Sequence, residues 1–246
     1  MECWEQILEK WKKQMINKDF EKLEKNLKIK FKNKKLLEQA FVHRSYLNEN
    51  LGCGLEQNER LEFLGDAVME LVVTNYLFKK FPKNPEGDLT AWRAALVNSK
   101  MLSEVAFRLG FNDYLILSKG ESQDNGRARQ FILANTLEAT IGAIYLDRGY
   151  NRAEGFIEKN IICELKRVLE EKLYVDPKSY FQEQAQGKVG ITPSYQVRSE
   201  EGPDHCKKFI VGCYLNKELI AEGEGPSKQT AQEDAARKAL VKKNWK

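Results

Sequence analysis

The sequence predicts an all-α domain followed by a small α+β domain whose elements run α-β-β-β-α, and three observations support this. Up to about residue 174, apolar residues recur at helical spacing and no alternating strand pattern occurs. Beyond that point, three short β-rich runs follow, separated by glycine and proline. The length of 246 residues suits one large and one small domain. We therefore expect a helical extension over residues 1–20, a first domain over 21–174 and a second over 175–246.

The extension and the first domain are expected to be helices joined by polar or glycine-containing loops. The predicted helices span residues 4–16, 21–50, 58–81, 89–110, 131–146 and 151–174. The predicted loops span residues 51–58, 82–88 and 118–130. Asn58 is the expected N-cap of the third helix. The apolar face of that helix is assigned to Leu61, Leu64, Ala67, Val68, Leu71 and Val72.

The second domain begins where Asp176 is a natural N-cap and Pro177 suits the first helical position. Three strands are then predicted over residues 195–199, 208–214 and 219–222. Ser227 is the expected N-cap of a last helix. The packing face of that helix is assigned to Ala231, Ala235, Ala236, Ala239 and Leu240.

Composition excludes several classes of protein. No run approaches the roughly 18 apolar residues of a membrane span, and the acidic N-terminus is unlike a signal peptide. The five cysteines are scattered without a C-x-x-C pair, and Cys206, His205 and Cys213 lack a fourth zinc ligand. We therefore expect no disulfide framework, no zinc site, no membrane partner and a reducing, cytoplasmic location.

Charge is distributed unevenly along the chain. Residues 1–36 hold eleven lysines against six acidic residues, residues 37–175 hold 17 basic against 20 acidic, and the remainder holds 12 against 10. Basic ends around an acidic middle suggest a protein whose ends hold a polyanion and whose middle holds cations.

Three acidic residues share one face of the helix that follows Asn58. At about 100° per residue, Glu59, Glu62 and Asp66 lie within about 60° of one another. Such a face is compatible with a solvated acidic surface, and spacing alone does not separate that interpretation from a metal site.

The apolar helix over residues 131–146 carries two strongly polar residues, Asn135 and Glu138. A buried carboxylate is costly unless it is paired with a cation. Glu138 is thus either salt-bridged to a basic residue or meets the Glu62 and Asp66 face in an all-oxygen site, which would suit Mg²⁺ or Mn²⁺. Glu86, in a predicted turn, is a further candidate whose spacing does not show whether it reaches this site.

The segment Asn58-Glu59-Arg60-Leu61-Glu62-Phe63-Leu64-Gly65-Asp66-Ala67-Val68 resembles the signature of the ribonuclease III family. The resemblance runs from about Leu23 to Lys243 and leaves out residues 1–20. It includes His43–Tyr46, Pro85–Asp88 and Ile132–Ala139. It implies an all-α endonuclease domain followed by a double-stranded-RNA-binding domain. It also implies hydrolysis of double-stranded RNA to 5′-phosphate and 3′-hydroxyl ends, in processing of rRNA and mRNA.

Carried over by motif, the resemblance assigns roles to individual residues. Metal ligands would be Glu62, Asp66, Glu138 and the residue at position 135, with Mg²⁺ as cofactor and Mn²⁺ as a possible substitute. Catalytic residues would be Asp66 and Glu138, with Glu59 and Glu86 as accessory acids. Phe63 would seat in the partner subunit of a symmetric homodimer. Metal-assisted hydrolysis needs no nucleophilic side chain, so we interpret His43 as structural.

Position 135 departs from the family, which has Asp where this chain has Asn135. A neutral carbonyl oxygen can still bind Mg²⁺ but removes one negative charge from the site. Three interpretations stay open: a working natural variant, a substitution made to trap a complex, or a protein that binds RNA and has lost cleavage. The last makes a non-cleaving double-stranded-RNA-binding protein the alternative function. A metal-independent helical interaction domain is disfavoured because it leaves Glu138 unexplained.

The second domain resembles a double-stranded-RNA-binding domain, which recognises the shape of the A-form duplex. The expected RNA-binding residues are Gln182, Gln186, His205, Ser227 and Lys228. Gln229 stands where the family often has a second lysine, which should weaken binding without abolishing it.

Overall fold

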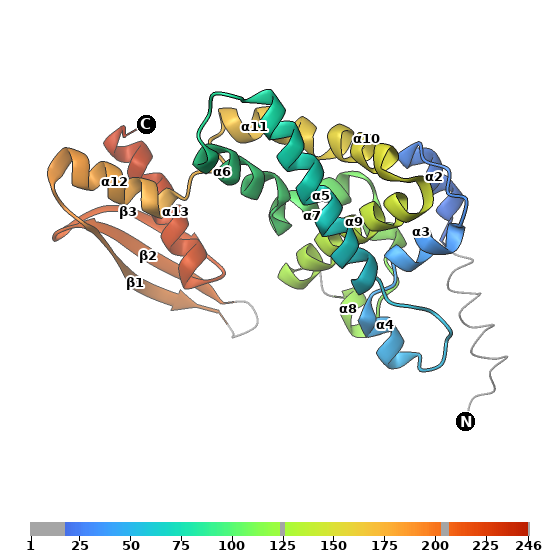
Figure 1. Ribbon diagram of the computed structural model, residues 1–246. Helices are drawn as coiled ribbons and strands as arrows, with labels where there is room; N and C mark the ends of the chain where they lie inside the picture. The colour runs from blue at the N-terminus through green and yellow to red at the C-terminus, as the bar shows by residue number, and fades with distance from the viewer. Residues whose placement is uncertain (1–17, 124–125, 203–206, 246) are drawn as a thin grey trace. The chain divides into compact units, whose positions relative to one another are not determined.

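The computed structural model describes residues 18–123, 126–202 and 207–245 (Figure 1). The chain divides into two compact units, the first ending at Glu171 and the second beginning at Lys172, which is three residues before the expected boundary. The helix expected over residues 4–16 lies outside the described residues.

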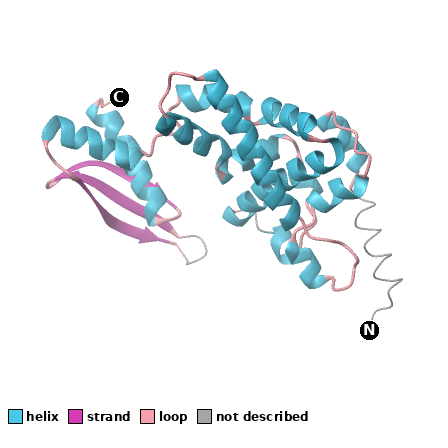
Figure 2. Ribbon diagram, viewed as in Figure 1, coloured by secondary structure: helices cyan, strands magenta, loops and turns pink. Residues whose placement is uncertain are grey.

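The first unit is helical, as predicted (Figure 2). Its helices are α2 (Phe20–Leu27), α3 (Lys34–Ala40), α4 (Arg44–Glu49), α5 (Glu59–Lys80), α6 (Glu86–Val97), α7 (Ser99–Arg108), η1 (Phe111–Tyr114), α8 (Lys119–Gln123), α9 (Arg127–Arg148), α10 (Tyr150–Asn160), η2 (Ile162–Glu164) and α11 (Leu165–Glu170). Among the described residues of this unit, β-structure is limited to an isolated bridge between Val42 and Ile116. No helix in the described part of the chain has the length and apolarity needed to cross a bilayer.

Several expected helices are shorter than predicted because local caps interrupt them. The 21–50 segment forms three helices, and the first ends where Lys28 takes a left-handed conformation with φ 58°. The 89–110 segment breaks at Asn98, whose side chain accepts from the Met101 N–H at 2.9 Å and so starts a new helix. The 151–174 segment likewise divides into α10, η2 and α11. The loop expected over 118–130 contains α8.

Asn58 precedes α5 as expected, but its side chain does not cap that helix. Its amide Nδ2 instead donates to the carbonyl of Ala40 at 3.2 Å, and its backbone N–H donates to the carbonyl of Val42 at 3.0 Å. Buried Asn58 therefore ties the start of α5 to the end of α3.

Helix α9 forms the centre of the first unit and packs against α5, α7, α10 and α3. Its closest neighbour is α5, because each helix presents a glycine at their crossing. A Cβ on Gly65 would lie 1.8 Å from the carbonyl oxygen of Glu138, and one on Gly142 would lie 2.2 Å from that of Leu61. The two backbones therefore touch, which no larger residue at either position would allow.

The α5–α9 contact also corrects the predicted core face of α5. Leu61, Val68 and Val72 are buried as expected, but Ala67 is exposed and Leu71 is 58% exposed. Residues on the side of Gly65 take their place in the core, namely Met69, Val73 and Leu77. Apolar residues at helical spacing form two stripes on α5, and the packing of α9 against α5 determines which stripe is buried.

The second unit has the predicted α-β-β-β-α order. It consists of α12 (Pro177–Val189), β1 (Pro193–Glu201), β2 (Lys208–Leu215), β3 (Glu218–Gly225) and α13 (Lys228–Lys243). The strands form an antiparallel sheet in the order β1-β2-β3, and both helices cover one face of it (Figure 2). The core consists of Phe181, Ala185, Cys213, Leu215, Ile220, Ala235, Ala236 and Ala239.

Both helix caps of the second unit form as the sequence predicts. The Asp176 carboxylate accepts from the N–H groups of Lys178 and Ser179, with Pro177 at the first helical position. Ser227 Oγ accepts from the Thr230 N–H at 3.1 Å. A Cβ on Gly223 would lie 2.1 Å from the backbone nitrogen of Ala235, so β3 and α13 also meet at backbone contact.

Candidate functional site

The glycine crossing of α5 and α9 brings the predicted acidic residues together. Glu62 and Asp66 flank Gly65 on α5, and the carbonyl that Gly65 contacts belongs to Glu138 itself. Asn135 lies one turn earlier on α9 and donates a side-chain hydrogen bond to Glu62. Two residues from each helix thus form one polar cluster at the point of closest approach, which we call the crossing cluster.

The crossing cluster is electrostatically strained. Burial, followed by the charges of Asp66 and Glu62, raises the pKa of Glu138 to about 8. Burial and the charges of Glu59 and Asp66 also raise the pKa of Glu62, while the hydrogen bond from Asn135 acts in the opposite direction. Both shifts follow from carboxylates that are withdrawn from water beside like charges.

The salt-bridge alternative for Glu138 does not hold among the described residues, where no lysine, arginine or histidine forms an ion pair with it. The charge that would balance this cluster must therefore come from outside that part of the chain, or Glu138 must keep its proton.

The donor chemistry of the crossing cluster fits a hard divalent cation. Three carboxylates and one amide oxygen offer only oxygen ligands, which Mg²⁺ and Mn²⁺ prefer, and a cation would offset the repulsion that raises both glutamate pKa values. The structure does not hold a complete set of ligands. In the described part of the chain, no three His, Cys, Asp or Glu side chains are placed so that they could coordinate one metal ion. Mg²⁺ commonly keeps several waters, so a partial cluster suits it better than a complete cage.

Glu59 lies beside the cluster, at the exposed start of α5. Its carboxylate accepts from Gln57 Nε2 at 2.9 Å and lies 3.7 Å from the Arg44 guanidinium. The position of Arg44 beside Glu59 does not follow from the sequence pattern, because a loop separates α4 from α5 and no local spacing relates the two. Glu59 is therefore partly neutralised, although its charge still raises the pKa of Glu62.

Glu86 is not among the residues whose charges shift the pKa of Glu62 or Glu138. Glu86 is the exposed first residue of α6 rather than a turn residue, and its carboxylate accepts from Thr90 Oγ1 at 3.2 Å. His43 precedes α4, and its Nδ1 accepts from the Ser45 N–H at 3.3 Å while contacting Ser45 Oγ at 2.8 Å. Burial lowers the pKa of His43, which suits a structural residue.

Phe63 is 82% exposed on the side of α5 that faces away from the core. Leu71 and Phe78 lie on the same side of the helix at helical spacing and are 58% and 69% exposed. Large apolar side chains aligned on a rigid helix are typical of a protein interface. We call these three residues the α5 stripe.

The predicted RNA-binding residues lie on separate elements of the second unit. Gln182 and Gln186 are exposed one turn apart on α12, and Gln186 donates to Thr192 Oγ1 at 3.1 Å. Ser227 caps α13, which Lys228 begins. His205 lies outside the described residues. Lys228 is engaged rather than free, because its Nζ lies 3.1 Å from a carboxylate oxygen of Glu200.

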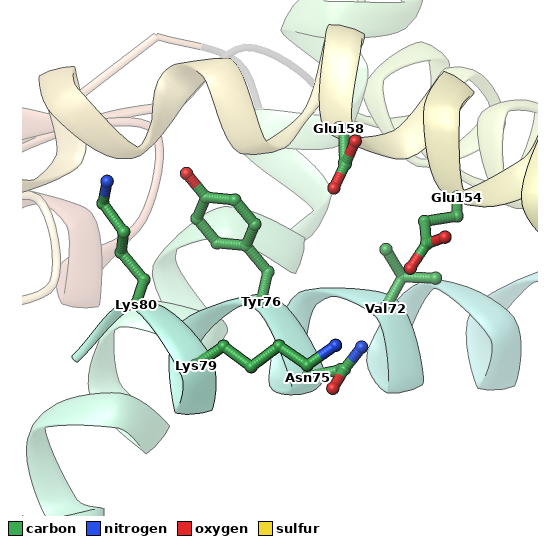
Figure 3. A pocket seen from close by; sticks show the side chains of 7 residues that line it. All are labelled: Val72, Asn75, Tyr76, Lys79, Lys80, Glu154 and Glu158. Carbon is green, nitrogen blue, oxygen red and sulfur yellow. The ribbon is translucent and has the colours of Figure 1, made fainter. Parts of the chain in front are cut away.

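A surface pocket of about 290 Å³ lies elsewhere in the first unit, between α5 and α10 (Figure 3). Tyr76 and Lys80 extend from α5 towards α10, which contributes Glu154 and Glu158. The remaining lining residues are Val72, Asn75 and Lys79. None of the predicted site residues lines this pocket, and the crossing cluster remains the best candidate for chemistry.

Three comparisons with known proteins bear on this site. Residues 33–165 match the model of the family described as ribonuclease-III-like, and residues 177–242 match that of the double-stranded RNA binding motif. Ribonuclease 3 of Enterococcus faecalis is 43% identical over 226 residues, which cover 92% of this chain and 98% of that protein. Ribonuclease 3 of Nitratiruptor is 41% identical over 91% of this chain and 96% of its own length.

A solved structure agrees with these sequence relatives. The nuclease domain of ribonuclease III from Campylobacter jejuni, described as flexible in a region involved in dimer formation, is 44% identical. The match covers 58% of this chain and 99% of that domain, with a TM-score of 0.53.

Proposed function

Because this chain belongs to the ribonuclease III family and is an endoribonuclease of double-stranded RNA, we propose that the crossing cluster is its metal-dependent active site. The observation that carries this proposal is the crossing itself: Glu62, Asp66 and Glu138 are held beside one another without a balancing cation in the described part of the chain. A divalent ion, with waters completing its coordination, would offset the repulsion among these carboxylates.

The proposed ligands are Glu62, Asp66, Glu138 and the side-chain oxygen of Asn135, and the proposed ion is Mg²⁺, with Mn²⁺ as a substitute. When bound, Mg²⁺ would polarise a phosphodiester oxygen, orient a water for in-line attack and neutralise the leaving 3′ oxygen. Asn135 would turn its carbonyl oxygen to the ion and release the hydrogen bond that it donates to Glu62. The products would carry 5′-phosphate and 3′-hydroxyl ends.

Proton exchange at Glu138 is a consequence of this arrangement. With a pKa of about 8, the Glu138 carboxyl holds a proton at neutral pH, and ligation requires the carboxylate. Ion binding therefore releases a proton from Glu138. Glu59 contributes negative potential beside Glu62. Glu86 would take part as an accessory acid from the start of α6.

We propose that two copies of the chain pair through the α5 stripe. The support is the 82% exposure of Phe63 on a rigid helix, in line with Leu71 and Phe78. A two-fold pairing would present two crossing clusters to one duplex. The second unit would add affinity for the duplex through Gln182, Gln186, His205, Ser227 and Lys228.

The decisive experiment is cleavage of an end-labelled RNA duplex in Mg²⁺, in Mn²⁺ and in EDTA, with analysis of the product ends. We expect short products with 5′-phosphates in either metal and none in EDTA. Glu138→Gln should bind the duplex and leave it uncut. Intact duplex in both metals, together with normal binding, would favour the alternative function, a non-cleaving RNA-binding protein. The observation that favours this alternative is the neutral side chain of Asn135.

We extend the proposal to processing of rRNA and mRNA in the cytoplasm. The support is membership of the family and the free thiols of Cys53, Cys163 and Cys213 among the described residues. Accumulation of unprocessed precursors on depletion of the protein, with its recovery in the soluble cell fraction, would test this.

A further inference from the structure

The β1–β2 end of the second unit holds a carboxylate between two lysines. Glu200 Oε1 lies 3.1 Å from Lys228 Nζ, and Glu200 Oε2 lies 3.3 Å from Lys207 Nζ. The three residues come from different elements: Glu200 from β1, Lys207 from the residues before β2, and Lys228 from the start of α13. One carboxylate thus bridges two cations with one oxygen each.

This geometry is the one that a phosphate group would take. A phosphodiester, like a carboxylate, presents two anionic oxygens that can each accept from a different ammonium group. The Glu200 carboxylate therefore stands in for a backbone phosphate. Hydrogen bonds from Lys228 and Lys207 also hold the pKa of Glu200 below its usual value, so it stays ionised at neutral pH.

Phe209 contacts Lys228 independently of Glu200. Glu200 and Gly225 pair with Phe209 from either side in the sheet register, and the Lys228 ammonium lies 5.7 Å from the centre of the Phe209 ring. A cation–π contact of this kind keeps Lys228 over β2 if Glu200 moves away. Lys228 therefore remains in place when Glu200 is exchanged for another anion.

We propose that Lys207 and Lys228 together form a phosphate-binding site for the RNA backbone, and that Glu200 occupies this site until RNA displaces it. The proposal rests on the proposed function, because it assumes that the second unit binds RNA duplex. Lys207 would then supply the second positive charge beside Lys228, because position 229, where the family often has a lysine, holds Gln229 in this chain. Glu200 would also be an internal competitor that limits affinity.

The test is binding of a fluorescein-labelled RNA duplex of about 20 base pairs to the full-length protein in EDTA, followed by fluorescence anisotropy over a range of KCl concentrations. The variants are Glu200→Gln, Lys207→Gln and Lys228→Gln. The matched control is Glu218→Gln, which removes the same charge from an exposed ion pair with Lys243 (3.3 Å) at the opposite end of β2.

Glu200→Gln should bind about threefold to tenfold more tightly at low salt, whereas Glu218→Gln should stay within about twofold of wild type. Lys207→Gln and Lys228→Gln should each weaken binding and lower the slope of log affinity against log salt by about 1. In the double variant Glu200→Gln/Lys207→Gln, the gain from removing Glu200 should shrink.

Two results overturn the inference: equal gains from Glu200→Gln and Glu218→Gln, or an unchanged salt slope in Lys207→Gln. If Lys228→Gln still weakens binding in those cases, the RNA-binding function stands and only the two-lysine site is wrong. If Lys228→Gln also leaves affinity and salt slope unchanged, RNA binding by this face of the second unit is refuted as well.

Discussion

Replacing Glu138 by glutamine should stabilise the metal-free protein, and increasingly so as pH rises. The Glu138 carboxyl has an ordinary pKa of 4.5 and a pKa of about 8 in the folded chain. Between these values the folded state holds a proton that the unfolded state has released. Rising pH therefore favours unfolding, by about 1.4 kcal/mol per pH unit, which reaches roughly 3 kcal/mol at pH 7.

Glutamine fills nearly the same space and cannot ionise, so Glu138→Gln removes this pH-dependent loss. The free energies of unfolding of the two proteins should coincide near pH 4.5 and differ by ~3 kcal/mol at pH 7, with the variant more stable. Urea unfolding in EDTA, followed by the helical circular dichroism signal that the first unit dominates, measures the difference. Exposed Glu86→Gln, which removes a carboxylate outside the crossing cluster, is the control and should not reproduce the gain of ~3 kcal/mol at pH 7.

Mg²⁺ should then reverse the order of stability. An ion that binds only the folded wild type adds about 4.1 kcal/mol at a thousandfold excess over its dissociation constant, which exceeds the roughly 3 kcal/mol by which the variant is more stable at pH 7. The Glu138→Gln variant should gain much less. Unfolding free energies of wild type and variant that run parallel from pH 5 to pH 8 would refute the reasoning, because they would show that Glu138 ionises in the fold as it does in water.

Three further predictions follow from the crossing and the α5 stripe. Asn135→Asp should lower the Mg²⁺ concentration for half-maximal cleavage and destabilise the metal-free chain at pH 7, because a fourth charge replaces the hydrogen bond to Glu62. Strongly reduced cleavage at unchanged Mg²⁺ affinity would contradict this prediction. Gly65→Ala should cost about 1–3 kcal/mol or more of stability in thermal unfolding, since its Cβ would lie 1.8 Å from the Glu138 carbonyl oxygen. Gly155→Ala, which has open space around it on α10, is the control and should be neutral or stabilising. Phe63→Ser should shift sedimentation towards the monomer, and Phe107→Ser, at a 67% exposed position on α7, should not; equal behaviour of the two variants would reject the α5 stripe as the interface.

Local spacing was enough to predict much of this protein. Helix and strand order in the second unit follows from caps and alternation that act within a few residues, as at Asp176 and Ser227. The shared face of Glu62 and Asp66 follows from the helical repeat, and the cost of burying Glu138 follows from its apolar surroundings. These are properties of one segment at a time, and the sequence determines them without reference to the rest of the chain.

Only the tertiary structure decided how segments meet. The backbone contact at Gly65 and Gly142 selects which apolar stripe of α5 is buried and sets Asn135 beside Glu62. Arg44 beside Glu59, and Glu200 between its two lysines, are pairings between elements that no spacing relates. The periodicity of a helix fixes the direction of each side chain about its own axis, whereas the partner it meets depends on the packing of whole elements against one another.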